Sequence, residues 1–501
     1  MKDKVLFWLD ANLIHYGIAN SLQNQHDCEL YAIISITNKP KKFFKEQKFV
    51  KFNKIWFYFD HVIKSVKKPD IQYLSTFEKK YNIKLWLLAY GERIFYRFND
   101  FYKFNTDEIL TILEQECKFF ENVLDEIKPD FLIMRAADFH HPQLLYEICK
   151  ARGIKVLLLG TPRFARRLLI SSLPHRIDFP INDTVDSTER ERTVKELQDF
   201  LKGYSYSDNL KTFSTKFQDS KIRLLKAAYG FLFSKNDNIK THYTYFGRTK
   251  LKVLLHSILY SIKTRINLHF INKNFARTIN EHTPFIYYPF QLDEESTSLM
   301  TYPFYTNQIE IITHIVKSLP IDYKLYLKEH PVMAFRGWRN KDYYKQIMKL
   351  PNVVLVHPSV KSDEILQKCS LVIAISSTSG LEAAFYKKPS IIFANTDYSH
   401  LSSVHKIENI ENLPDVIRSS LHDEIDVSDL NKYVNFIEKN SFEFDISELE
   451  LSYHHYFYHG GYLVDVPITQ SQMESYLEKF KTQYDKLALE HVKKIKYFKN
   501  R

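Results

Sequence analysis

The chain has 501 residues, of which 45% are hydrophobic and 26% are charged, and its formal net charge at pH 7 is +11. This composition excludes an intrinsically disordered chain, and the length predicts two or more domains. No apolar run approaches the roughly 20 residues that cross a bilayer, and four scattered cysteines, Cys28, Cys117, Cys149 and Cys369, favour a reducing compartment without a zinc site.

The first 180 residues alternate apolar runs with helical patterns. Residues 5–9 and 30–36 indicate strands around a helix at 11–23, and the N-terminus is interpreted as a strand because it lacks a cleavage site for a signal peptide. A long helix capped by Thr106 and the strand at 131–134 predict a parallel sheet. The type of three apolar segments stays open: 52–59, 71–77 and 85–89. The turn after residue 9 lacks GxGxxG, so no dinucleotide cofactor is expected.

Two loops of this first domain carry a carboxylate that is a candidate general base. Asp138 follows the predicted strand at 131–134 and lies beside His140 and His141, and Glu92 follows the apolar segment 85–89. Carboxylates at the C-terminal edge of a parallel sheet can face a ligand. The alternative for Asp138 is simple capping of the next helix, and Glu92 has the same ambiguity.

Residues 181–282 are predicted to form a basic helical insertion. Within residues 211–280, 14 Lys and Arg stand against 2 Asp, a net of +12 that accounts for the excess charge of the chain. Residues 250–270, KLKVLLHSILYSIKTRINLHF, predict a basic amphipathic helix that fits an anionic membrane surface. A solvated, lysine-rich insertion is the alternative. No nucleic-acid-binding motif accompanies the charge, so nucleic acid is not an expected partner.

A second domain, residues 283–425, repeats the alternation of strands and helices. Its predicted strands are 284–290, 323–327, 352–356, 371–375 and 390–393, and its predicted helices are 305–319, 343–350 and 363–368. Residues 426–501 predict a helical tail, of which 470–499 could fold back onto the first domain. The predicted fold class is therefore α/β, with two Rossmann-like doubly wound domains, a helical insertion and a helical C-terminal tail.

The second domain contains a candidate anion site in LVIAISSTSGLEAAFYKKPSIIFA, residues 371–394. A strand there leads into a hydroxyl-rich turn, and a helix is predicted to begin at Leu381. The turn consists of Ser376, Ser377, Thr378, Ser379 and Gly380. Free backbone N–H groups and the positive end of the helix dipole favour an anion at such a place. An ordinary helix cap is the alternative.

A histidine upstream strengthens the anion hypothesis. The strand predicted at 323–327 runs into Lys328-Glu329-His330-Pro331. Pro331 cannot continue a sheet ladder and holds His330 in an extended geometry. His330 is therefore expected at the C-terminal edge of the sheet, where ligands of open parallel sheets bind.

These two motifs resemble a known family. KEHP followed by SSTSGLEAAFYKKPSIIF is similar to the C-terminal half of bacterial capsule and surface polysaccharide biosynthesis proteins. Those proteins resemble the His-Pro/Ser-Ser glycosyltransferases that use cytidine-nucleotide donors, such as Kdo transferases and polysialyltransferases. The likeness is clearest over residues 284–394, is only topological over residues 1–180, and is not expected over residues 181–280. It implies the GT-B architecture, with two Rossmann-like domains facing each other across a cleft.

The resemblance implies roles for the matching residues. His330 would donate a proton or a hydrogen bond to the departing phosphate, which Ser376 and Ser377 would hold. Glu382 is placed to meet a ribose hydroxyl, although a first-turn Glu is also ordinary helix-dipole chemistry. The donor-binding residues expected in all are Lys328, Ser376, Ser377, Thr378, Ser379, Gly380, Glu382, Gln291 and Glu295. For Lys328, a solvated neighbour of the site is an equal alternative.

The first domain departs from the family pattern. The acidic motif that supplies the base in the cytidine-donor sialyltransferases has no clear counterpart, which leaves the base open between Asp138 and Glu92. No D-x-D triplet is present, so metal-independent transfer is favoured. Three tail histidines, His454, His455 and His459, lack paired carboxylates or cysteines and are interpreted as packing or surface residues.

The predicted function is a glycosyltransferase of capsule or surface polysaccharide biosynthesis. It would move a sugar from a nucleotide donor, expected to be CMP-linked, to a glycan or lipid-linked acceptor, in the cytoplasm or peripherally at the inner membrane face. No cofactor is expected beyond this co-substrate. Two alternatives stay open: a CDP-polyol phosphotransferase, and a non-catalytic capsule assembly or export factor that binds polymer through its basic segment.

Overall fold

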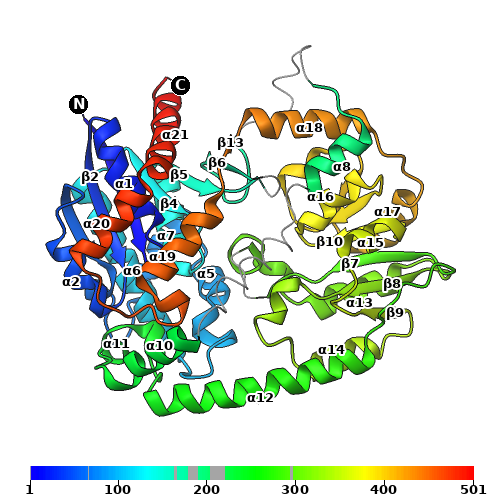
Figure 1. Ribbon diagram of the computed structural model, residues 1–501, viewed down its shortest axis with the longest axis horizontal. Helices are drawn as coiled ribbons and strands as arrows, with labels where there is room; N and C mark the ends of the chain where they lie inside the picture. Colours follow the sequence, from blue (N-terminus) through cyan, green and yellow to red (C-terminus); the bar gives the residue numbers. More distant parts are fainter. Residues whose placement is uncertain are drawn as a thin grey trace.

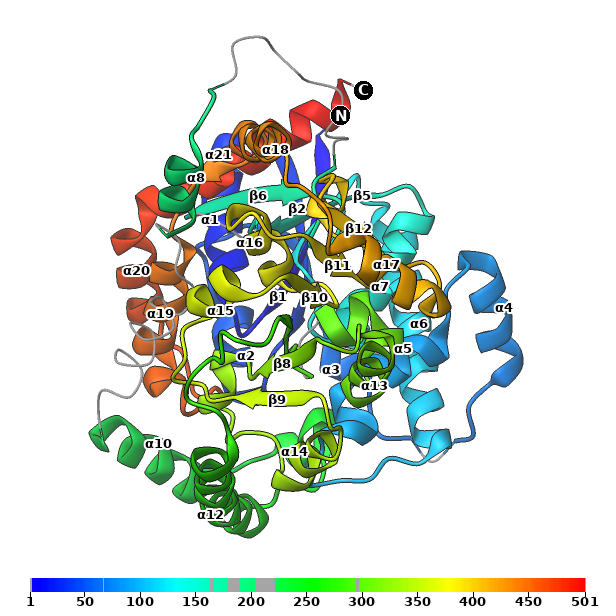
Figure 2. The same cartoon turned by 90° about the vertical axis from the view of Figure 1, so that its right-hand side faces the viewer.

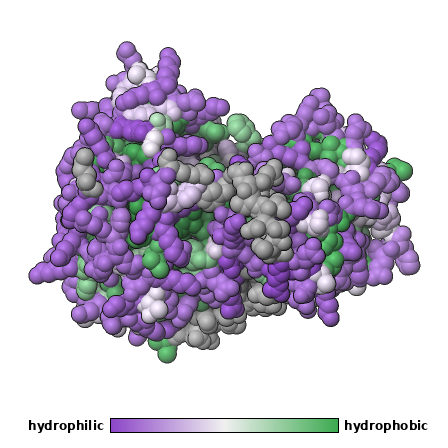
Figure 3. Space-filling view, turned by 90° about the horizontal axis from the view of Figure 1, so that it is seen from above, coloured by the Kyte–Doolittle hydropathy of each residue, from purple (hydrophilic) through white to green (hydrophobic). Residues whose placement is uncertain are grey.

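The computed structural model describes residues 2–65, 67–162, 166–178, 190–202, 221–293 and 297–500. Within these ranges the chain forms two sheets, each in its own lobe, and the lobes stand side by side in Figure 1. Seen from above, the two lobes present a mostly hydrophilic surface (Figure 3). The predicted α/β fold with two Rossmann-like domains is confirmed.

The first domain is built on a seven-stranded sheet with the order β13-β6-β5-β4-β1-β2-β3. Its central pairs β5–β4, β4–β1, β1–β2 and β2–β3 are parallel, and β6 and β13 join antiparallel at one edge. The strands are β1 (Asp3–Asp10), β2 (Cys28–Ser35), β3 (Phe52–Phe57), β4 (Phe131–Arg135), β5 (Lys155–Gly160), β6 (Arg167–Ser171) and β13 (Phe442–Glu443).

Both faces of this sheet are covered, which explains the continuous apolar run in β1. Val5, Phe7 and Leu9 point into one core, whereas Leu6 and Trp8 point into the other, because successive side chains of a strand alternate between faces. The helices of residues 1–162 are α1 (Ile14–Gln25), α2 (Asn38–Glu46), α3 (Tyr58–His61), α4 (Ile71–Tyr81), α5 (Leu85–Gly91), η1 (Arg93–Arg97), α6 (Thr106–Ile127) and α7 (His140–Ala151).

The second domain is built on a six-stranded parallel sheet with the order β12-β11-β10-β7-β8-β9. Its strands are β7 (Phe285–Pro289), β8 (Lys324–Lys328), β9 (Val353–Val356), β10 (Leu371–Ala374), β11 (Ser390–Ile392) and β12 (Val404–Lys406). Its α-helices are α13 (Gln308–Ser318), α14 (Lys341–Met348), α15 (Ser362–Lys368), α16 (Thr378–Phe385) and α17 (Leu413–Ser420).

The rest of the chain crosses between the two domains more than once. α8 (Val194–Lys202) and α18 (Val427–Lys439) pack on the second domain, where Leu197 and Tyr433 share a core with Leu381 of α16. The tail then returns to the first domain through α19 (Ile446–Phe457), α20 (Gln470–Lys479) and α21 (Lys481–Lys499), whose apolar residues enter the core on the Val5 side of β1. Figures 1 and 2 show α21 beside α1, with both termini nearby.

Three helices of the predicted insertion lie along the lower edge of the molecule in Figure 1. They are α10 (Lys221–Phe233), α11 (Asn238–Thr241) and α12 (Lys250–Asn274). α12 extends from beneath the first domain to beneath the second, and its C-terminal end enters the second core through Ile271. Among the described residues, every helix is too short or too polar to span a bilayer.

Local details differ from the sequence expectations. The long helix α6 is capped by Asn105, not Thr106, because the Asn105 side chain and Glu108 form a reciprocal capping box. Of the apolar segments whose type was open, residues 52–57 form a strand, whereas 71–81 and 85–91 form helices. α16 begins at Thr378 rather than Leu381, so the hydroxyl-rich turn is largely the first turn of the helix itself.

Candidate active site

The two motifs of the second domain come to one edge of its sheet. β7 lies between β8 and β10 and is parallel to both, so all three strands end at the same edge. Gln291 follows β7 by two residues, His330 follows β8 by two, and Ser376 follows β10 by two. Two strand spacings separate the ends of β8 and β10, which is about 10 Å. A nucleotide phosphate group at this edge can therefore lie between the imidazole and the serines.

The Ser-Ser turn forms the N-terminus of α16. Ser377 is the N-cap, and its side-chain oxygen accepts a hydrogen bond from the backbone N–H of Ser379 at 3.1 Å. The hydroxyl of Tyr398 donates to the carbonyl oxygen of Ser377 at 2.5 Å. A Cβ at Gly380 would lie 2.9 Å from that hydroxyl, so only glycine fits there without a shift of its neighbour. Ser376 is buried and Ser377 is half-buried. These hydrogen bonds and the close packing at Gly380 hold the backbone of the turn in place.

The imidazole of His330 is held in one orientation. Its Nδ1 accepts a hydrogen bond from the backbone N–H of Val332 at 3.2 Å. Burial, reinforced by the positive charges of Arg339, Arg336 and Lys328, lowers the pKa of His330 to about 4. The ring is therefore neutral at pH 7, and because Nδ1 accepts, its proton sits on Nε2. His330 is thus prepared to donate a hydrogen bond through Nε2.

Lys328 and Glu382 lie together behind this edge. The Lys328 ammonium donates to the hydroxyl of Ser362 at 2.8 Å. Burial lowers the pKa of Lys328 to about 8, although the charges of Glu382 and Asp363 oppose the shift. Burial likewise raises the pKa of the Glu382 carboxyl to about 7, against the hydrogen bond from Thr378 and the charge of Lys328. Both groups can therefore change protonation when a charged ligand arrives.

A buried arginine that the sequence reasoning missed fixes the loop after β7. The Arg339 guanidinium forms ion pairs with Glu329 and Asp293 and also donates to the carbonyl oxygen of Gln291. The Gln308 side chain forms two hydrogen bonds with the backbone of Gln291. It accepts from the Gln291 N–H at 2.8 Å and donates to the Gln291 carbonyl oxygen at 2.9 Å. Gln291 is therefore held at the sheet edge. Glu295, predicted beside it, lies outside the described residues.

This edge of the second sheet faces the first domain. The segment after β7 contains η4 (Thr297–Thr301), and it packs so closely on α5 that a Cβ at Gly91 would lie 2.6 Å from the carbonyl oxygen of Leu299. The segment after β11 also contacts the segment that follows β6 of the first sheet, because the Asp397 carboxylate accepts a hydrogen bond from the backbone N–H of Ile177 at 2.9 Å. The predicted donor site therefore lies on the side of its domain that meets the other domain.

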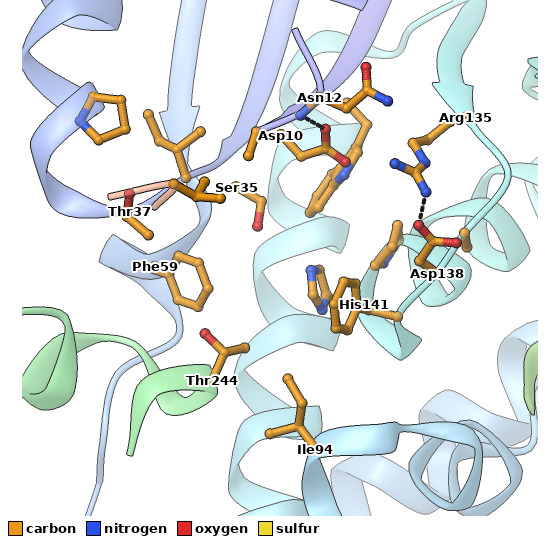
Figure 4. Close-up of a pocket in the computed structure, with 18 of the residues that line it drawn as sticks. Asp10, Asn12, Ser35, Thr37, Phe59, Ile94, Arg135, Asp138, His141 and Thr244 are labelled. Atoms are coloured by element: carbon orange, nitrogen blue, oxygen red, sulfur yellow. Dashed lines mark hydrogen bonds and ion pairs between the residues drawn. The ribbon is translucent and has the colours of Figure 1, made fainter. Parts of the chain in front are cut away.

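The first domain has a cavity of about 520 Å³ at the C-terminal edge of its own sheet. Asp10, Ser35 and Arg135, which end β1, β2 and β4, line it together with His141 and Thr244 (Figure 4). A second cavity of about 230 Å³ adjoins it and shares Asn12, Arg135, Ala136 and Asp138. Mixed apolar walls with a few convergent polar groups are typical of small-molecule sites.

Two carboxylates line this cavity, each with different polar partners. Asp138 forms an ion pair with Arg135. It does not cap α7, whose N-cap is Phe139, so the capping alternative for Asp138 is wrong. Asp10, which the sequence reasoning passed over as the end of a strand, accepts a hydrogen bond from the backbone N–H of Asn12 at 2.7 Å. Burial raises the pKa of the Asp10 carboxyl, although Arg135 and the Asn12 N–H oppose the shift.

Glu92 does not reach this cavity, which corrects the expectation that it supplies the base. It is fully buried and accepts from the backbone N–H of His140 at 3.0 Å and from Nδ1 of the same histidine at 2.7 Å. Nε2 of His140 lies 2.9 Å from Glu116. Burial would lower the pKa of His140, but Glu116 and Glu92 raise it to about 10, so His140 is a charged link between two buried carboxylates.

The same cluster contains possible metal ligands. Among the described residues, Glu92, His140 and His141 are a group whose ligand atoms all lie within 4.8 Å of one another. Both nitrogens of His140 already face carboxylates, however, and Nδ1 of His141 lies 3.0 Å from the hydroxyl of Tyr243. These bonds account for the cluster as a structural network. Of the tail histidines, His454 lines the larger cavity and His455 contacts Arg223.

Comparisons with known proteins bear on the second domain. Residues 210–401 match the family model described as capsule polysaccharide biosynthesis protein. The match includes residues 210–280, so the expectation of no likeness over residues 181–280 is wrong for that part. A search of curated protein sequences gave no match.

The solved structures that resemble this chain do so weakly. The β-Kdo 2,7-transferase KpsC of Thermosulfurimonas dismutans shares 11% identity, with 67% of this chain and 88% of that chain covered and a TM-score of 0.30. The UDP-GlcNAc 2-epimerase of Methanocaldococcus jannaschii shares 12% identity, with coverages of 84% and 94% and a TM-score of 0.24. The predicted resemblance is confirmed by the family model: over residues 210–401, which hold both the His-Pro and the Ser-Ser motif, this chain matches the capsule polysaccharide biosynthesis proteins.

Proposed function

We propose that this protein is a glycosyltransferase of capsule or surface polysaccharide biosynthesis. The observation that supports the proposal is that His330 and the Ser376–Ser377 turn follow strands that end at one sheet edge, on either side of β7. The family match over residues 210–401 includes both motifs and supports the assignment to capsule synthesis.

The donor side acts by stabilising the leaving phosphate. The turn residues from Ser376 to Gly380 offer hydroxyls and the N-terminus of α16, and His330 offers its Nε2 proton. Each hydrogen bond to a charged group contributes about 1.5–3 kcal/mol, and the helix terminus adds about 0.3–1 kcal/mol. Because negative charge on the phosphate grows as the bond to the sugar breaks, these donors stabilise the transition state more than the ground state. Because the His330 ring is neutral, it stabilises the phosphate as a hydrogen-bond donor rather than as a positive charge.

The acceptor side needs a general base, and we assign it to Asp10 ahead of Asp138. The Asp138 carboxylate is already engaged in an ion pair with Arg135. Asp10 lies in the same cavity, and its pKa is raised by burial, which brings a carboxylate closer to the pKa of an effective base. Arg135 is placed to orient the acceptor or to compensate charge between the two carboxylates.

The finer features of the reaction belong to the same proposal. The donor nucleotide is a cytidine nucleotide, the acceptor is a glycan or a lipid-linked glycan, and transfer needs no metal ion. The support is the pattern of His-Pro and Ser-Ser motifs without a D-x-D triplet. The reaction takes place in the cytoplasm.

A nucleotide screen followed by a transfer assay tests the proposal. CMP should raise the melting temperature more than CDP, UDP or GDP, since a ligand at 100 times its Kd stabilises by about 2.7 kcal/mol. His330→Ala should then lose transfer of sugar from a CMP-linked donor and keep its fold. His282→Ala is the matched control, because His282 is exposed and precedes β7 at the opposite edge of the sheet. A His330→Ala protein with undiminished transfer, or a product joined through phosphate, would contradict the proposal.

A further inference from the structure

α12 is attached to the body of the protein along one side only. Near its start, Nε2 of His256 lies 3.0 Å from the Asp100 carboxylate of the first domain. Near its end, the Asn267 side chain donates to the carbonyl oxygen of Gly337 in the second domain at 3.3 Å, and Ile271 is buried in the second core. Figure 2, which shows the helix nearly end-on, places it at the lower margin of the molecule. The opposite side of α12 therefore faces outward.

That outer side carries a continuous apolar row, which we call the outer stripe. It consists of Leu251, Leu254, Leu255, Ile258, Leu259, Ile262 and Ile266, which are between 38% and 68% exposed. Spacings of three and four residues place these side chains on one face of a helix. From Leu251 to Ile266 the stripe is about 22 Å long at 1.5 Å per residue. A contiguous exposed apolar row of this kind marks an interaction surface.

α10 adds a second apolar row beside the start of α12. Ile222, Leu225, Tyr229 and Phe233 follow helical spacing and are between 65% and 73% exposed. The end of α10 is joined to the start of α12, because the Lys250 ammonium donates to the carbonyl oxygen of Leu232 at 2.6 Å. The face of the molecule seen from above in Figure 3 is, by contrast, mostly hydrophilic.

Every charged residue of α12 itself is basic. The sequence has no Asp or Glu from Asn238 to Asn280. Lys252 and Lys263 are exposed and each follows a stripe residue by one position, which places them about 100° around the axis, at the margin of the stripe. Arg265 is exposed within the stripe itself. An apolar face with a basic margin and no acidic residue of its own complements an anionic bilayer surface, whereas a soluble protein partner of ordinary composition does not require this pattern.

We propose that the outer stripe of α12, continued by the apolar row of α10, docks this protein on an anionic lipid bilayer with α12 lying in the plane of the interface. The leucines and isoleucines enter the boundary between headgroups and acyl chains, and Lys252, Lys263 and Arg265 contact lipid phosphates. Because α12 is attached to both domains, both are then held at a fixed height above the lipid. The proposal does not depend on the glycosyltransferase assignment.

Vesicle flotation with the full chain tests this docking. The wild-type protein should bind vesicles of equal parts phosphatidylglycerol and phosphatidylcholine, bind pure phosphatidylcholine at least tenfold more weakly, and dissociate as salt is raised. Ile258→Ser/Ile262→Ser should bind the anionic vesicles at least tenfold more weakly. Ile321→Ser is the matched control, because Ile321 is a fully exposed isoleucine of the second domain. Equal binding by the stripe variant and the wild type would overturn the proposal.

The role of the basic residues and the insertion of the outer stripe into the bilayer can be tested separately. Lys252→Glu/Lys263→Glu should lose anionic-vesicle binding, whereas Lys349→Glu, an exposed lysine that follows α14, should keep it. A fluorophore sensitive to polarity, attached to Ile258→Cys, should shift to shorter emission wavelengths on anionic vesicles, and the same label on Ile321→Cys should not. If the stripe variant instead abolishes a dimer seen in sedimentation while vesicle binding is unchanged, the surface belongs to a second copy and the membrane proposal is refuted.

Discussion

Replacement of His330 separates a hydrogen-bonding role from a role as a charged acid. Burial and three neighbouring cations lower the pKa of His330 to about 4, and its Nδ1 accepts from the Val332 N–H. The ring is thus a neutral donor through Nε2 above pH 5. His330→Ala removes one hydrogen bond to a charged phosphate, worth about 1.5–3 kcal/mol, which corresponds to about 10- to 150-fold weaker binding of CMP.

The control for this experiment is His330→Gln, whose side-chain amide can donate a hydrogen bond but cannot act as an acid. Titration calorimetry with CMP should give a Kd for His330→Gln within about tenfold of the wild type. Since the neutral form of His330 predominates throughout, the contribution of this residue to binding should not change between pH 5 and pH 8. Equal loss in both variants, together with a wild-type affinity that falls as pH rises through 6–7, would refute the reasoning and indicate an imidazolium.

Three further predictions concern the rest of the site. Gly380→Ala forces a Cβ to within 2.9 Å of the Tyr398 hydroxyl and should lower the free energy of unfolding in urea by about 1–3 kcal/mol; an unchanged value would contradict the tight packing of this turn. His140→Ala leaves two buried carboxylates without their cation and should cost about 3–5 kcal/mol. Because the folded-state pKa of His140 is raised to about 10, the wild-type advantage should be full below pH 6.5 and decline as pH rises through 10. Asp10→Asn should reduce transfer about 100-fold with the CMP affinity unchanged, and an active Asp10→Asn protein would return the base to Asp138.

The sequence by itself determined which edge of the second sheet holds the predicted donor-binding residues, because the sequence signals for that edge are local. Pro331 fixes the backbone beside His330, Ser377 caps the helix that follows its strand, and apolar runs of four to six residues mark parallel strands that are buried on both faces. Parallel pairing then requires the ends of β7, β8 and β10 to share an edge. The two motifs and the sheet that joins them could therefore be predicted before any coordinates were known.

Only the tertiary structure decided which carboxylate of the first domain is the candidate base and how the chain passes between the two domains. Asp10 looks like the end of an ordinary strand until β4 pairs beside β1 and Arg135 and the cavity appear next to it. Glu92 looked equally suited to be a base, but its partner His140 is 48 residues away, and only folding shows both of its bonds to that histidine. Such contacts depend on which segments pack together, and that is settled by burial of the whole chain rather than by the pattern of any one segment.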